Sequence, residues 1–199
     1  MSARHLLVWA PLLLAAGCAP ATPPAPAAPV LTPVVTVKEL MTHIIDPIAD
    51  WVFDAVGVDV TAAGVTEIKP VSDEEWLKVE SGAITLAESA NLLKMRRLVA
   101  PADDHRVNQP GQPAPELSTA EIQAKIDGDF ARWEQYVDQL RTASLDALTI
   151  IRKRDVQGLY TAGSLIDDAC ESCHLEYWYP GDKALIEADA KKRATYGNN

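Results

Sequence analysis

Apolar residues recur every three or four positions along four stretches of the chain, which is the spacing of amphipathic helices. The stretches cover about residues 37–56, 72–99, 118–151 and 156–178. Their apolar positions are Met41, Ile44, Ile45, Ile48, Val52 and Ala55; Trp76, Val79, Ala83, Leu86, Ala90 and Leu93; Ile122, Ile126, Phe130, Trp133, Val137, Leu140, Ser144, Leu148 and Ile151; and Leu159, Ala162, Ile166, Ala169, Cys170 and Cys173. No convincing strand pattern accompanies them. We therefore expect an all-α fold, specifically a four-helix bundle.

Capping and helix-breaking residues mark the ends of these stretches. Ser72 and Ser118 each stand three residues before a glutamate, the capping-box pattern that begins a helix. Asp155 can cap the last stretch. Pro47 lies inside the first stretch and should bend it or begin a new turn. The Pro-Gly pair at residues 180–181 should end the last helix.

The connecting segments are less regular. Residues 57–71 alternate loosely between apolar and polar, which suits either a short hairpin or a loop. Residues 101–117 are rich in proline and are expected to form a loop. We expect the folded domain to cover residues 34–180. Residues 181–199 then form a tail, in which 182–193 can make one more short helix.

The first residues have the composition of an export signal. Arg4 precedes an apolar run over residues 6–14, and small residues then lead to Cys18. The run is too short to span a membrane, which takes roughly 20 apolar residues. Residues 14–18, Leu-Ala-Ala-Gly-Cys, resemble a bacterial lipobox, in which the cysteine is lipidated. The alternative is an ordinary cleavable signal with an incidental cysteine.

The lipobox hypothesis also explains the segment that follows. Residues 1–17 would be removed, and residues 18–33 alternate mainly proline and alanine. Such a segment cannot pack a core and behaves as a stiff, extended spacer. A spacer between an anchor and a folded domain is what a tethered protein needs. By resemblance to bacterial sorting rules, Ala19 in place of aspartate implies the outer membrane.

Charge narrows the choice of partners. The 199 residues carry a formal net charge of −10, and the Lys and Arg side chains are not clustered enough to grip phosphates. The composition therefore argues against a nucleic-acid partner. A soluble acidic protein is the simplest interpretation, and a basic redox partner is compatible with it.

The sharpest motif is Cys-Glu-Ser-Cys-His at residues 170–174, the attachment signature of c-type haem. On a helix, positions i, i+3 and i+4 share one face. Cys170 and Cys173 can then bond to the two vinyl groups on one porphyrin edge, and His174 can reach the iron. The cysteine count agrees, with one for lipid and two for a single covalent haem.

Three other kinds of site use the same cysteines. A structural zinc site needs four ligands; Cys18 lies in the signal region, which leaves His43 and His105 as distant extra ligands. A thioredoxin-like pair needs a βαβ frame, whereas the pattern here is helical. A disulfide between Cys170 and Cys173 would be geometrically poor within a helical turn. Haem attachment is the favoured hypothesis.

With this motif near the C-terminal end of four helices, residues 34–178 resemble the class II c-type cytochromes, the cytochrome c-prime group. The resemblance implies a four-helix bundle whose last helix attaches the haem. The family commonly has an aromatic residue three places after the histidine, and Tyr177 matches. It commonly has arginine next, where this chain has Trp178. The long connections also mark the chain as a divergent member.

The resemblance also points to a residue for the sixth iron position. Low-spin members of the family place a methionine from the first helix there, and Met41 lies early in that helix on its apolar face. The alternative is that Met41 only fills the core. His43 lies two positions on and should point away from that face. His105 lies in a polar stretch and is expected to be solvated.

Other large or charged residues have simpler interpretations. Trp51, Trp76 and Trp133 fall one to each of the first three helices, where core packing explains them. Arg96 and Arg97 are expected to lie solvated at a helix end, with haem propionates as the alternative partners.

These observations predict a periplasmic, lipid-anchored electron carrier with one His/Met-ligated haem c and no enzymatic activity. Its partners would be redox proteins, and a homodimer is left open. If Met41 is not a ligand, the alternative is a five-coordinate protein that binds nitric oxide or carbon monoxide. A peroxidase would need a distal general base, and only His43, facing the wrong way, is available in the first helix.

Overall fold

A computed structural model describes residues 31–101, 104, 116–183 and 186. The predicted signal segment, Cys18, most of the linker, His105 and most of the expected short helix at 182–193 lie outside these residues. The described elements are α1 (Val37–Leu40), the π-helix η1 (Met41–Ile45), α2 (Asp46–Phe53), β1 (Gly57–Thr61), β2 (Gly64–Ile68), α3 (Asp73–Leu93), α4 (Thr119–Gly128), α5 (Phe130–Arg152) and α6 (Val156–Tyr177). The described chain is mostly helical, in agreement with the predicted all-α class.

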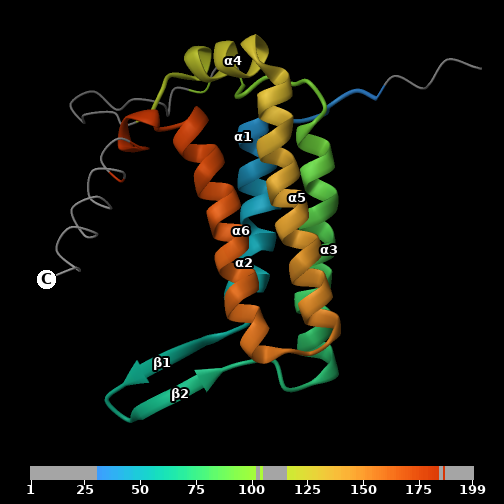
Figure 1. The fold of residues 1–199 in the computed structure, drawn as a ribbon, viewed down its shortest axis with the longest axis vertical. Coiled ribbons are helices and arrows are strands. Elements are labelled where there is room, and N and C mark those ends of the chain that lie inside the picture. Colours follow the sequence, from blue (N-terminus) through green and yellow to red (C-terminus); the bar gives the residue numbers. More distant parts are fainter. Residues whose placement is uncertain (1–30, 102–103, 105–115, 184–185, 187–199) are drawn as a thin grey trace, which may run out of the picture. The chain divides into compact units, whose positions relative to one another are not determined.

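The continuous segment α1–η1–α2 lies alongside α3, α5 and α6, and we call these four segments the helical body (Figure 1). α3 packs on α5, α5 packs on α6, and α2 contacts both α3 and α6. α4 crosses one end of the helical body, and the β-hairpin projects from the other end. The predicted stripes on α3, α5 and α6 are almost entirely buried, with Leu86, Trp133, Leu159 and Ile166 at 0–1% exposure.

The bend expected in the first helix takes the form of a π-helical turn. The Asp46 amide donates to the Met41 carbonyl, five residues back. Pro47 follows in the first turn of α2. Proline has no N–H to donate, and its ring clashes with the carbonyl four residues earlier in an α-helix. A π-helical turn stands directly before the proline, and the chain stays helical through it.

Two boundaries differ from the prediction. The third stretch is two helices, because Asp129 leaves the helical conformation with φ −144° and ψ 74°. Gly128 favours the break, and the Asp129 side chain caps α5 by accepting from the Arg132 amide at 2.9 Å. α3 ends at Leu93 rather than near Val99, and the Arg97 guanidinium donates to the Leu92 carbonyl in its last turn.

The predicted helix starts are confirmed. Ser72 and Ser118 form reciprocal capping boxes with glutamates three residues on, and the Asp155 side chain accepts from the Gly158 amide. Residues 57–71 hold an antiparallel hairpin in which Val60 pairs with Val65. Within the described residues, no helix combines the length and apolar character needed to cross a membrane.

Candidate functional site

A pocket of about 270 Å³ lies between the η1–α2 segment, α5 and α6. Its lining residues are Met41, Thr42, Ile45, Asp46, Ala49, Phe53, Leu93, Tyr136, Val137, Leu140, Asp167, Ala169, Cys170, Glu171, Cys173 and His174. The walls are mainly apolar, while Thr42, Asp46 and Asp167 are exposed at the mouth. The pocket thus joins Met41 to the Cys170–His174 motif, which lies about 130 positions further along the chain.

α6 places the motif residues on the pocket side. Cys170, Cys173 and His174 fall within the last two turns of this helix, and all three line the pocket. The two cysteines are free thiols, not bonded to each other. Burial is the main cause that raises the pKa of Cys170 to about 11 and that of Cys173 to about 12. At neutral pH both thiols are therefore protonated in this fold.

His174 is half-buried beneath two aromatic residues that follow α6. The ring centroids of Trp178 and Tyr179 each lie 6.0 Å from that of His174. The Tyr179 hydroxyl donates to Glu171 at 2.7 Å, which ties this aromatic cover back to the helix. Burial lowers the pKa of His174 below its ordinary value of 6.5. The imidazole is thus held largely neutral, the form that can bind a metal.

Among the residues weighed for the second ligand position, Met41 lines the pocket and His43 does not. Met41 is half-buried at the start of η1, whereas His43 is exposed. Haem propionates were the alternative partners expected for Arg97. Its guanidinium instead donates to the carbonyls of Val35, Leu92 and Met95. Arg96 lies over the Phe130 ring, 4.0 Å from its centroid.

The pocket contains residues that the sequence pattern did not single out. Tyr136 is 6% exposed on α5 and packs edge-on to Tyr177, with ring centroids 5.8 Å apart. The carboxylates of Asp46, Asp167 and Glu171 line the pocket from α2 and α6. Their helical spacing from the motif could have indicated the two on α6, but Asp46 comes from another element. Trp51, expected in the core, is 38% exposed, and the Lys78 ammonium lies over it.

Within the described part of the chain, no three or more His, Cys, Asp or Glu side chains are grouped so that they could hold a bare metal ion. In comparisons with known proteins, no family model, no curated protein and no solved structure matches the chain.

Proposed function

We propose that this chain is an exported c-type cytochrome that carries electrons through one covalent haem. Cys170 and Cys173 would form its thioether bonds, and His174 and Met41 would be its axial ligands. The observation that supports this most is that all four side chains line one pocket, although they come from opposite ends of the folded domain. Periodicity alone would have allowed Met41 to face any neighbouring helix.

The pocket has the chemistry that a porphyrin needs. The thiols and the imidazole share one helix face, and most of the wall opposite is aliphatic or aromatic. Its volume of about 270 Å³ is just under the ~300–1,000 Å³ range of small-molecule sites. The open mouth suits a flat group held covalently at one edge. A haem bound here would supply a one-electron iron couple, and thioether ligation would raise its reduction potential.

The position of Met41 favours the carrier over the gas binder. Met41 lies in a π-helical turn, a feature frequently found at functional sites. The turn directly precedes Pro47, and it supplies Met41, Thr42 and Ile45 to the pocket wall. With Met41 bound to iron no coordination position is open, so the protein would exchange electrons and perform no bond chemistry.

The arrangement of the helical body supports a finer description of the fold. Four helical segments lie side by side, and the motif is on the last of them. We propose that this is the four-helix bundle of class II c-type cytochromes, with a π turn, a projecting hairpin and a crossing helix as its departures.

The decisive experiment on the haem is extraction with acid and acetone. Protein produced together with a haem-maturation system should retain its haem, and the Cys170→Ala/Cys173→Ala variant should yield little holoprotein. Cys18→Ala is the matched control, because it removes the remaining cysteine and should leave haem attachment intact. A wild-type haem that extracts freely would refute the proposal.

The spectrum of the holoprotein decides between carrier and gas binder. With Met41 as ligand, the ferric protein should be low-spin and show the weak far-red sulfur-to-iron charge-transfer band. The ferrous protein should bind carbon monoxide slowly or not at all. A high-spin wild type that takes up carbon monoxide readily would replace the carrier with the gas-binding alternative.

We further propose that the mature protein is lipidated at Cys18 and tethered in the periplasm, at the outer membrane. The support is the lipobox-like residues 14–18 and the Pro/Ala spacer over residues 18–33. Its partners would be other redox proteins of the cell envelope. Mass spectrometry of the mature N-terminus tests this, and an unmodified peptide that begins anywhere other than Cys18 would contradict it.

A further inference from the structure

Three carboxylates border the pocket that we assign to the haem. Asp46 opens α2 on one side, while Asp167 and Glu171 lie on α6, three residues before and one after Cys170. All three line the pocket. The remaining lining residues are apolar or uncharged except His174, so these side chains dominate the electrostatic potential of the site.

Among the described residues, these three carboxylates have no oppositely charged partner in an ion pair, whether Lys, Arg or His. Glu171 accepts a hydrogen bond from the Tyr179 hydroxyl at 2.7 Å, which fixes its position and leaves its charge in place. Asp46 and Asp167 are exposed at the mouth.

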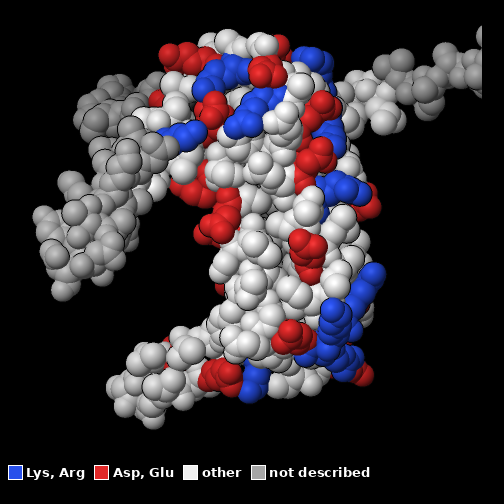
Figure 2. Space-filling view, in the orientation of Figure 1, with Lys and Arg blue, Asp and Glu red and all other residues white. Residues whose placement is uncertain are grey.

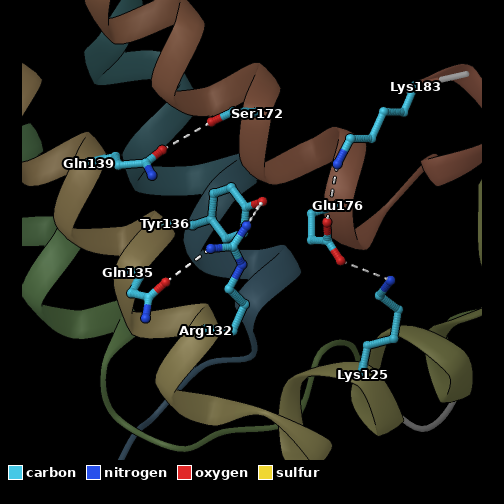
Figure 3. A network of polar contacts seen from close by, with 8 residues as sticks. All are labelled: Lys125, Arg132, Gln135, Tyr136, Gln139, Ser172, Glu176 and Lys183. Atoms are coloured by element: carbon cyan, nitrogen blue, oxygen red, sulfur yellow. Dashed lines mark hydrogen bonds and ion pairs between the residues drawn. The ribbon is translucent and has the colours of Figure 1, made fainter. Parts of the chain in front are cut away.

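Glu176, further along the same helix, shows the opposite arrangement. Lys125 lies 3.2 Å and Lys183 3.6 Å from its carboxylate oxygens, as Figure 3 shows. Glu176 does not line the pocket. In Figure 2, acidic side chains lie along the α6 side of the molecule, and Lys and Arg side chains are intermixed with acidic ones toward the C-terminal end of that helix. On α6, Glu176 is thus paired with lysines away from the pocket, whereas Asp167 and Glu171 line the pocket and form no ion pair among the described residues.

Negative charge at this position acts on an iron couple in a defined direction. Oxidation adds one positive charge at the iron, and nearby carboxylates favour the oxidised form. The apolar walls weaken solvent screening, while the exposure of two of the groups leaves part of the effect sensitive to salt. The same field already acts on the motif: after burial, the charges of Asp167, Asp46 and Glu171 contribute to the raised pKa of Cys170.

We propose that Asp46, Asp167 and Glu171 lower the reduction potential of the haem by stabilising ferric iron, in opposition to the thioether of Met41. The inference rests on the proposed function. It assigns a role to three side chains that are neither ligands nor attachment points, and it makes this protein a carrier of lower potential than its His/Met ligand pair alone would give.

The test is redox titration of the holoprotein and of Asp46→Asn, Asp167→Asn, Glu171→Gln and the triple variant. Each neutral side chain is close in size to the native one, and the amide oxygen introduced by Glu171→Gln can still accept from Tyr179. We expect each single change to raise the midpoint potential and the triple change to raise it most. The difference between wild type and triple variant should shrink as salt concentration rises.

The matched control is Asp168→Asn. Asp168 follows Asp167 on the same helix but lines a different groove, between the outer faces of α5 and α6. The Asp168→Asn variant removes the same single negative charge as Asp167→Asn. Because Asp168 does not line the pocket, this variant should shift the midpoint potential by much less than Asp167→Asn. Optical spectra of every variant should keep the wild-type spin state, which separates an electrostatic shift from a change of ligand.

The ways in which the proposal can fail are distinguishable. A wild type that forms no covalent haem refutes the proposed function itself. A wild type that holds its haem, together with a triple variant of unchanged or lower potential, refutes only the role of the three carboxylates. A shift from Asp168→Asn as large as that from Asp167→Asn also refutes it, because the effect would then reflect net charge and not position.

Discussion

The contact between α3 and α5 and the contact between α2 and α6 are built from the same helical repeat, but the pocket that contains the Cys170–His174 motif opens at the second. Between α3 and α5, small and large side chains alternate until the space is filled: Ala83, Leu86 and Ala90 are fully buried, and Trp133 is 1% exposed. Between α2 and α6 the π turn and Pro47 alter the path of one partner. The periodicity of apolar residues decides which helix faces are buried. It does not decide whether two buried faces pack against each other without leaving a cavity.

The largest expected effect on stability is in the closed contact. The Trp133 indole N–H donates to the Leu93 carbonyl at 2.9 Å. The indole also packs edge-on to the Tyr177 ring, with ring centroids 5.1 Å apart. Trp133→Ala should lower the free energy of unfolding by about 3–5 kcal/mol, because it leaves a cavity and an unpaired carbonyl. Urea denaturation measures this. Trp51→Ala, at a site 38% exposed, should cost less than about 1 kcal/mol, and equal losses would contradict the packing described.

Leu40 and Met41 are adjacent in the chain, but Leu40 lies in the core and Met41 lines the pocket. Leu40 is 1% exposed, so Leu40→Ala should cost about 2–5 kcal/mol in unfolding free energy and leave the spin state unchanged. Met41→Ala should cost about 1–2 kcal/mol, because the side chain is only half-buried. It should also convert the ferric haem to high spin and lower its potential.

The measurements are the ferric spectrum and the urea denaturation curve of both the Leu40→Ala and the Met41→Ala variant. If Leu40→Ala altered the spin state and Met41→Ala did not, the assignment of the pocket ligand would be wrong.

Helix caps give a smaller effect that is independent of the pocket. The Ser72 hydroxyl accepts from the Glu75 amide at 3.2 Å at the start of α3. Ser72→Ala should therefore lower the free energy of unfolding by about 1 kcal/mol, with no change in the haem spectrum. Ser81→Ala is the control on the same helix, since that hydroxyl bonds only to the Leu77 carbonyl one turn back. It should be neutral or slightly stabilising.

The smallest expected effect is a contribution of the same cap to acid stability. Hydrogen bonds from the Ser72 and Val71 amides hold the pKa of Glu75 below its ordinary value of 4.5. The stabilisation is complete above pH 4.5 and is lost as the pH falls through the lowered value in the folded protein. Glu75→Gln should thus flatten the fall in stability below pH 4.5. Thermal melts between pH 6 and pH 3 measure this, and a variant curve parallel to the wild type would contradict it.

Local signals explain why much of the helix pattern was predictable. A capping box needs residues only three positions apart, so Ser72 and Ser118 could be recognised directly. The buried stripes on α3 and α6 follow from spacing along one helix. The break at Asp129 was missed because the apolar stripe continues across it, from Ile126 through Phe130 to Trp133. The π turn was foreseen only as a bend, since Pro47 excludes the α-helical bond without selecting its replacement.

The sequence by itself determined that Cys170, Cys173 and His174 share a helix face, because that relation lies within one turn and needs no other element. It also determined the apolar character of the helix faces. Tertiary structure alone decided that the face of the first segment that carries Met41 meets the motif on α6, that Tyr136 forms part of the wall, and that Asp46 joins Asp167 and Glu171 in lining the pocket. These relations depend on how separate helices are rotated and packed against one another, which no local repeat encodes.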